Sequence, residues 1–380
     1  MNMGEKHLIK DFKHELSSHC ESSTLRDLIM HENIPISEET VFGLDSTFGF
    51  TFWDNRSSDI PIADSESGYP LFIGGKQGTI TKDSLVCRIL GLNITMGTFS
   101  SKEVAWESSK KFLQQDIPVG IQLDLGFLPY MEEAEDIHFG GHWVALVGYD
   151  EDNGLAYVSE TDRAVIQEVP IEMLLNARNS KHGYSFVHPH NRQITIKRRL
   201  DGKKPPFAKA VKLAIQEVAR HVLSPSMNFH GIPAMTLFLK TIPKWSETLQ
   251  GQVKYEGKMT SKAYFALDIL YGLIETWGTG GAAFRNLYVG FLKELLNHAD
   301  INEGQFAWNE EEKFYLEEAG EFLLNSAGLW NKFTSSIKKG LDMGKENILN
   351  YIDLKELENI FDQIILLEKK CFKNLLNIKL

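Results

Sequence analysis

The stretch HFGGHWVALVGYD, residues 138–150, decides the fold of the N-terminal half of the chain. Its run at 143–149 is rich in valine and aromatic residues, which is typical of a strand. A second strand-like run, LAYVS at 155–159, follows DEDNG at 150–154, whose Asn-Gly pair supplies the positive φ angles of a tight turn. These runs predict a β-hairpin, and VGIQLDL at 119–125 predicts a further strand.

His142 stands at the beginning of the predicted strand, after two glycines that leave room for close approach. A neutral imidazole there would take a proton from a nucleophile and later return it to a leaving group. Continued to 161, the second run flanks the turn symmetrically with 143–149, so Asp162 is expected roughly opposite His142, where it would orient the ring. Two alternatives stay open: His142 as a core histidine bonded to the backbone, and Asp162 as a solvated turn acid paired with Arg163.

Cys20 lies far upstream, at the start of the first predicted helix, which covers 22–31 with Ser22 or Ser23 near its N-cap. Unpaired N–H groups and the positive end of the helix dipole both favour a thiolate there. The same N–H groups would stabilise an oxyanion. The alternative is a small buried side chain. The order Cys, His, Asp is that of papain-like proteins.

Length and charge limit the classes of partner. The 380 residues suit two domains of roughly 150–200 residues each. Lys and Arg number 40 and Asp and Glu 51, and this net charge of −11 argues against a nucleic-acid partner. No run reaches the roughly 18 apolar residues of a membrane span. The polar residues 1–13 do not resemble a secretory signal, so the cytoplasm is the expected location.

Neither a disulfide framework nor a metal site is expected. The three cysteines, at 20, 87 and 371, show no paired spacing. His138 and His142 are four residues apart, but the glycines between them argue against the helix that a zinc pair would need. We therefore expect no metal and no cofactor.

The two halves of the chain differ in pattern. ITIKRRLDGKKPP, residues 194–206, combines five basic residues with a glycine and two prolines and predicts a boundary. Beyond it, helical spacing predicts helices at 207–223, 232–249, 259–277, 281–298, 310–326, 328–341 and 353–377. We expect an α+β fold: a papain-like domain with an antiparallel sheet at 1–196, a basic linker at 197–206 and an all-helical domain at 207–380.

Several motifs carry a family resemblance. They are HCES at 19–22 with LR at 25–26, VFGL at 41–44 with GF at 49–50, DL at 124–125 with LPY at 128–130, HFGGHWVALVGYD at 138–150 and AR at 177–178. Together they resemble the N-terminal domain of the butirosin-biosynthesis acyltransferase family, which looks related to papain-like C39 cysteine peptidases. GTGG at 278–281, followed by Phe284-Arg285, Tyr288 and Phe291-Leu292, resembles the helical domain that commonly follows it.

The resemblance implies acyl transfer by a thiol in secondary-metabolite biosynthesis. Cys20 would attack a thioester, His142 would act as base and then acid, and Asp162 would orient His142. In the butirosin case the donor is a carrier-protein thioester and the acceptor an aminoglycoside amine. For this chain it implies an acyl donor such as an acyl carrier protein and a small-molecule amine acceptor. The alternatives are a C39-like cysteine peptidase or amidase, and a non-catalytic binding protein on the same fold.

The oxyanion donor is the point where the sequence departs from papain-like peptidases. These usually place a Gln several residues before the nucleophile, whereas residues 12–19, FKHELSSH, contain none. His14 or His19 would donate instead, or the backbone alone would. Asp124 is either a wall of the site or a satisfied structural acid, and His138 is expected to be structural or to line the cleft.

Two basic features lie outside these motifs. Lys197, Arg198, Arg199, Lys203 and Lys204 form either a solvated linker or a docking site for an acidic carrier protein. Arg285 is expected in a surface or interdomain salt bridge.

Overall fold

The computed structural model describes residues 5–56, 69–76, 78–131, 138–182, 187–255, 258–344 and 347–379. The chain divides into a first unit, Met1–Val41 with Ile80–Lys204, and a second unit, Phe42–Thr79 with Pro205–Leu380. These spatial units differ from the expected linear order at residues 42–79. The domain limits 1–196, 197–206 and 207–380 therefore stay a prediction, while the expected α+β class is confirmed.

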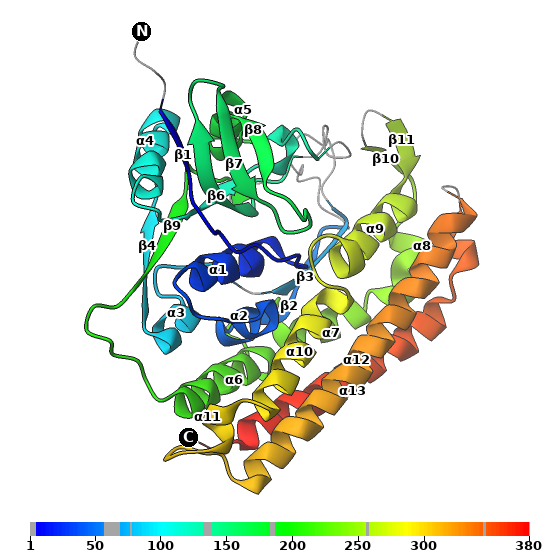
Figure 1. The fold of residues 1–380 in the computed structure, drawn as a ribbon. Helices are drawn as coiled ribbons and strands as arrows, with labels where there is room; N and C mark the ends of the chain where they lie inside the picture. Colours follow the sequence, from blue (N-terminus) through cyan, green and yellow to red (C-terminus); the bar gives the residue numbers. More distant parts are fainter. Residues whose placement is uncertain are drawn as a thin grey trace. The chain divides into compact units, whose positions relative to one another are not determined.

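The first unit is built on an antiparallel sheet in the order β4-β9-β5-β6-β7-β8, with β1 also paired to β6 (Figure 1). The strands are β1 (Lys6–Leu8), β4 (Leu92–Gly97), β5 (Val119–Leu123), β6 (His142–Asp150), β7 (Leu155–Ser159), β8 (Gln167–Pro170) and β9 (Gln193–Arg198). Every residue of β6 is buried, because β5 and β7 pair with its edges and both α1 and α4 pack against it. The predicted hairpin is confirmed as β6–β7.

Helices of the first unit carry and support this sheet. They are α1 (Cys20–His31), α3 (Leu85–Leu90), α4 (Lys102–Leu113), the short 3-10 helix η1 (Leu125–Phe127) and α5 (Ile171–Arg178), while α2 (Glu38–Leu44) spans the sequence boundary between the units. A hydrophobic core that includes Trp106, Val144 and Val158 lies between α4, α5 and the sheet strands. Trp106 is thus a core residue.

The first helix starts two residues earlier than predicted. Its N-cap is His19, which has an extended backbone and whose ring nitrogen Nδ1 accepts the N–H of Ser22 at 3.3 Å. Because this imidazole does what a serine or threonine does at most helix starts, the sequence rule for caps pointed to Ser22 or Ser23. Cys20 is consequently the first residue of α1.

The second unit is mainly helical but not entirely so. Its strands pair as β2 (Phe48–Asp54) with β3 (Leu71–Lys76), and β10 (Gln252–Tyr255) with β11 (Lys258–Ser261). Its helices are α6 (Phe207–Leu223), α7 (Gly231–Leu239), η4 (Ile242–Lys244), α8 (Trp245–Thr248), α9 (Lys262–Tyr271), the π-helical η5 (Gly272–Thr276), η6 (Ala282–Phe284), α10 (Arg285–Leu296), α11 (Ala299–Asn302), α12 (Glu310–Met343), η7 (Ile348–Tyr351) and α13 (Leu354–Asn377). The expectation of an all-helical segment at 207–380 is wrong for β10 and β11.

Two predicted helix boundaries also differ. The segments 310–326 and 328–341 form the single helix α12, in which Gly328 faces open space and causes no break. The predicted helix 232–249 is interrupted where Pro243 opens η4. Within the described ranges, every helix is too short or too polar to cross a membrane.

Arg285 lies in the core of the second unit, which corrects the expectation of a surface or interdomain salt bridge. Its guanidinium donates two hydrogen bonds of 2.9 Å to the two carboxylate oxygens of Glu368, and both side chains are fully buried. Ser326 and Trp330 of α12 donate to the same carboxylate at 3.0 Å. The pair therefore ties α10 and α12 to α13; the last two helices lie side by side along their length (Figure 1).

Candidate active site

Cys20 occupies the first turn of α1, and Glu38 of α2 holds that turn in place. The Glu38 carboxylate accepts the main-chain N–H groups of Ser18 at 2.9 Å and His19 at 2.8 Å, and the hydroxyl of Ser22 at 3.0 Å. Burial raises the pKa of Glu38, and these donors oppose that rise. Cys20 itself is partly exposed. The Glu38 carboxylate thus holds the start of α1, while Cys20 stays partly exposed.

His142, the first residue of β6, lies between two groups that raise its pKa: Cys20 acts on the ring by charge and hydrogen bonding, and Glu160 is hydrogen-bonded to it. The bond to Glu160 joins Nε2 to a carboxylate oxygen at 2.9 Å, so Nδ1 is the ring nitrogen left for the thiol. The His142 and Glu160 side chains are 10% and 1% exposed. A nucleophile, an imidazole and a carboxylate therefore lie in one chain of contacts, which is the arrangement of an activated thiol.

The charges of this chain support each other. Burial alone lowers the pKa of His142, but the negative charges of Glu160 and Cys20, together with their hydrogen bonds, raise it well above its ordinary value. Burial raises the pKa of Glu160, but the charge and hydrogen bond of His142 and the donors Thr161 and Tyr130 lower it overall. These interactions thus favour the protonated form of His142 beside the ionised carboxylate of Glu160.

The predicted orienting residue, Asp162, does not contact His142. The hairpin register pairs Ala145 with Ser159, as the symmetry argument requires, but β7 ends at Ser159. Past that point the chain turns, so Glu160 reaches the imidazole and Asp162 points away. Asp162 is 60% exposed, and its nearest cation is Arg163 at 3.6 Å. The carboxylate of the site is Glu160, and Asp162 is the turn acid of the alternative interpretation.

Tyr130 belongs to the site, although no role was predicted for it. Its hydroxyl donates to Glu160 at 3.0 Å, on the carboxylate oxygen that also contacts His142. The other oxygen accepts the main-chain N–H of Thr161 at 2.7 Å. Burial, followed by the charge of Glu160, raises the pKa of Tyr130 well above its ordinary value, so it remains a donor.

His14 is not placed to donate to an oxyanion. Its Nε2 donates to the main-chain oxygen of Arg163 at 2.6 Å. Its Nδ1 lies 2.6 Å from the Ser159 hydroxyl and 3.2 Å from Asp27. Both nitrogens are therefore occupied within the protein, which corrects that expectation. His19 caps α1 with its Nδ1, so that nitrogen is occupied as well.

Asp124 and His138 form a separate polar cluster ahead of β6. The fully buried Asp124 carboxylate contacts His138 Nδ1 at 2.9 Å and accepts Ser180 Oγ at 2.6 Å. It also accepts the N–H groups of Gly126 and Phe139 at 3.1 and 3.0 Å. Asp124 is thus the satisfied structural acid of the two alternatives, and it holds the approach to His142.

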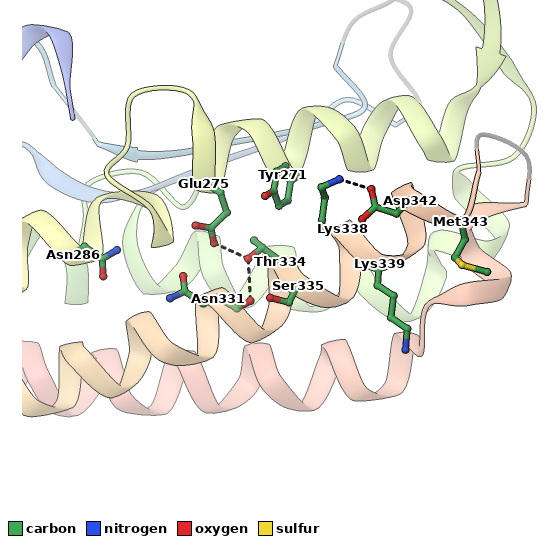
Figure 2. Close-up of a pocket in the computed structure, with 10 residues that line it drawn as sticks. All are labelled: Tyr271, Glu275, Asn286, Asn331, Thr334, Ser335, Lys338, Lys339, Asp342 and Met343. Carbon is green, nitrogen blue, oxygen red and sulfur yellow. Dashed lines mark hydrogen bonds and ion pairs between the residues drawn. The ribbon is translucent and has the colours of Figure 1, made fainter. Parts of the chain in front are cut away.

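No metal-binding group is evident among the residues with a described placement, since nowhere do three His, Cys, Asp or Glu side chains gather as ligands. A polar cavity of about 640 Å³ lies within the second unit (Figure 2). It is lined by Tyr271, Glu275, Asn286, Asn331, Thr334, Ser335, Lys338, Lys339, Asp342 and Met343. Thr334 donates to Glu275 at 2.6 Å, and Lys338 pairs with Asp342. None of these ten residues is a cysteine or histidine, so this lining offers no thiol–imidazole pair.

Comparison with known proteins identifies two matching family models. The model described as butirosin biosynthesis protein H, N-terminal, matches residues 19–161, and the model described as domain of unknown function (DUF4872) matches residues 172–375. Cys20, His142 and Glu160 all lie within the first match. No curated protein matches the chain.

Proposed function

We propose that this chain is a cysteine-dependent acyltransferase of antibiotic biosynthesis. It belongs to the family whose models are the butirosin biosynthesis protein H N-terminal domain and DUF4872. The family relates the chain to butirosin biosynthesis, and the proposal adds the chemistry. One observation carries it: Cys20, at the start of α1, raises the pKa of an imidazole whose Nε2 is held by Glu160 at 2.9 Å. A structural thiol needs no such partner.

The first half-reaction acylates Cys20. His142 holds the proton that the Cys20 thiol gives up, and the thiolate attacks the carbonyl carbon of an acyl thioester. The main-chain N–H of Cys20, in the first turn of α1, supports the oxyanion that forms. When the intermediate collapses, the carbon–sulfur bond of the donor breaks, and the departing thiolate takes the proton from His142. An acyl-Cys20 thioester and a free donor thiol result.

The second half-reaction transfers the acyl group to an amine. The amine nitrogen attacks the acyl-Cys20 carbonyl and gives a proton to His142. Collapse breaks the bond to the Cys20 sulfur, which leaves as a thiolate beside the imidazolium, and an amide is released. In both half-reactions Glu160 accepts a hydrogen bond from Nε2, and this contact keeps Nδ1 turned toward the thiol. We propose an acyl carrier protein as the donor and a small-molecule amine as the acceptor.

Product analysis with the full chain tests this function. The protein is incubated with an acyl thioester of cysteamine, with and without a panel of amines that includes an aminoglycoside. We expect the N-acylated amine to form with wild type and not with Cys20→Ser. Formation of only the free carboxylic acid in the presence of every amine would favour a hydrolase on the same residues. No turnover with any donor would leave a binding protein.

A further inference from the structure

The segment before Cys20 is tied to the turn that carries Glu160. His14 Nε2 donates to the main-chain oxygen of Arg163 at 2.6 Å, and the Ser17 N–H donates to the main-chain oxygen of Thr161 at 2.9 Å. The turn after β7 is therefore held at two points just past Glu160. These contacts join residues that are more than a hundred positions apart in the sequence, so they connect two distant segments of the chain.

The second ring nitrogen of His14 reaches the other side of Glu160. Nδ1 lies 2.6 Å from the hydroxyl of Ser159, the residue directly before Glu160, and 3.2 Å from Asp27. The Ser159 hydroxyl also donates to Asp27 at 3.2 Å. Side chains of His14 and Asp27 are only 8% and 2% exposed. Glu160 is thus bracketed by contacts that converge on one buried imidazole.

Asp27 links this imidazole to the helix of the nucleophile. Both residues of the Arg26–Asp27 ion pair belong to α1, and Arg26 donates to the Asp27 carboxylate at 2.9 and 2.6 Å. Arg26 also holds the upstream segment, with a donor 2.6 Å from the main-chain oxygen of Glu15. His14 therefore lies where the helix that begins at Cys20 meets the turn that ends in Glu160.

We propose that His14 is a positioning residue, which holds the Glu160 turn against α1 and so keeps Glu160 in contact with His142. The inference rests on the proposed function, because it assigns His14 a part in activating Cys20. His14 touches neither Cys20 nor any reacting atom. It acts through Ser159 and the main chain of 161–163.

The protonation of His14 decides how many of these contacts form together. A main-chain oxygen can only accept, so Nε2 carries a proton in either state. In the imidazolium, Nδ1 donates as well, and the Ser159 hydroxyl is free to donate to Asp27. In the neutral ring, Nδ1 must accept from Ser159, and Asp27 loses that donor. The hydrogen bond to Asp27 raises the pKa of His14, against burial and the charge of Arg26, and so favours the fully bonded state.

A double-mutant cycle on Cys20 alkylation tests this proposal. The probe is iodoacetamide, whose rate reports the thiolate and requires neither acyl donor nor acceptor. We expect His14→Gln to slow alkylation about tenfold at neutral pH and to move the midpoint of the pH–rate profile to higher pH. In the Glu160→Gln background the same substitution should add no further slowing. His7→Gln, which removes an exposed histidine–aspartate contact on β1, is the matched control and should leave the rate unchanged.

Three outcomes decide the matter. A wild-type rate in His14→Gln, or slowing that multiplies with that of Glu160→Gln, overturns the positioning role. If His14→Gln does not fold, Ser159→Ala replaces it, because this variant keeps the contact of His14 with Arg163. We expect Ser159→Ala to slow alkylation by a smaller factor, and only while Glu160 is present. Slowing in the Glu160→Gln background as well would overturn the proposal. If the alkylation rates follow the expected pattern but no acyl transfer occurs, the proposed function is rejected and the positioning role of His14 stands.

Discussion

The imidazole of His142 and the carboxylate of Glu160 meet at 2.9 Å in the interior of the first unit, where both side chains are shielded from solvent. Burial of either group alone would favour its neutral form. Together they favour the charged forms, because the pKa of His142 is raised and that of Glu160 is lowered. Cys20 acts on the same ring by charge and hydrogen bonding. In the proposed function, the reactivity of the thiol depends on this pair.

Glu160→Gln should weaken the thiol, whereas Asp162→Asn should not. The amide keeps the size of the side chain but removes the charge that favours the His142 imidazolium. We expect alkylation of Cys20 by iodoacetamide to slow about 10- to 100-fold, as the loss of a close buried charge implies. Asp162 is 60% exposed and forms an ion pair with Arg163 instead of His142, so its amide should react at the wild-type rate. If Asp162→Asn slowed alkylation and Glu160→Gln did not, Asp162 and not Glu160 would be the carboxylate of the site.

The charged pair predicts a window of pH in which it stabilises the fold. The pKa of His142 is raised above 6.5, so its contribution is complete below pH 6.5 and is lost as the pH rises through the raised value. The pKa of Glu160 is lowered from 4.5, so its contribution is complete above pH 4.5 and is lost as the pH falls through the lowered value.

We therefore expect the free energy of unfolding of wild type to exceed that of the His142→Gln/Glu160→Gln double variant most between pH 4.5 and 6.5. Urea titrations across the range from acid to alkaline pH measure the difference. A difference that stays constant with pH would show that the pair is not ionised in the folded protein.

The two glycines before His142 are not equivalent. A Cβ on Gly140 would lie 2.7 Å from the main-chain oxygen of Val187 and from Cδ of Pro189, whereas one on Gly141 would meet only the ring of Phe139, which is largely exposed. We expect Gly140→Ala to destabilise the fold by about 1–3 kcal/mol, because rigid neighbours cannot move away. Gly141→Ala should cost less than about 1 kcal/mol, since the Phe139 ring can rotate. Thermal unfolding compares the two, and equal costs would contradict this account of the approach to His142.

The second unit should depend on its buried ion pair. Arg285→Met leaves the Glu368 carboxylate buried without its cation and should destabilise the protein by about 3–5 kcal/mol. Lys355→Met, which breaks a pair whose lysine is 74% exposed on α13, should cost less than about 1 kcal/mol. Chemical denaturation of both variants gives the comparison. A loss in Arg285→Met no greater than in Lys355→Met would mean that Glu368 is neutral or otherwise satisfied.

Local patterns were sufficient to predict the elements that hold the nucleophile and the base. Strand runs on both sides of an Asn-Gly turn predict the β6–β7 hairpin, and a cysteine ahead of an amphipathic run predicts its place at a helix start. The hairpin register was predicted only in part: Tyr149 pairs with Ala156 instead of Leu155, and an irregularity between Leu146 and Gly148 brings Ala145 opposite Ser159. What the pattern does not contain is the point at which β7 leaves the sheet. The symmetry argument continued the strand two residues past Ser159, to 161, and so placed Asp162 where Glu160 lies.

The remaining site residues depend on contacts between distant segments. Tyr130 reaches Glu160 across 30 positions, and His14 reaches Ser159 across 145. No periodicity or spacing in the sequence relates these residues, because side-chain hydrogen bonds between loops leave no repeating pattern. His19 as a helix cap was missed for a related reason, since the usual rule favours short polar side chains. The residues that the sequence did not predict are therefore those that support Cys20 and His142.

The most direct measurement is the intact mass of the protein after brief incubation with an acyl thioester and no amine. Wild type should gain the mass of one acyl group, on the peptide containing Cys20, and added amine should remove it. Cys20→Ser should gain nothing under the same conditions. An unmodified wild-type protein, or the same mass gain in Cys20→Ser, would contradict the claim that this thiol, activated by His142, carries the acyl group.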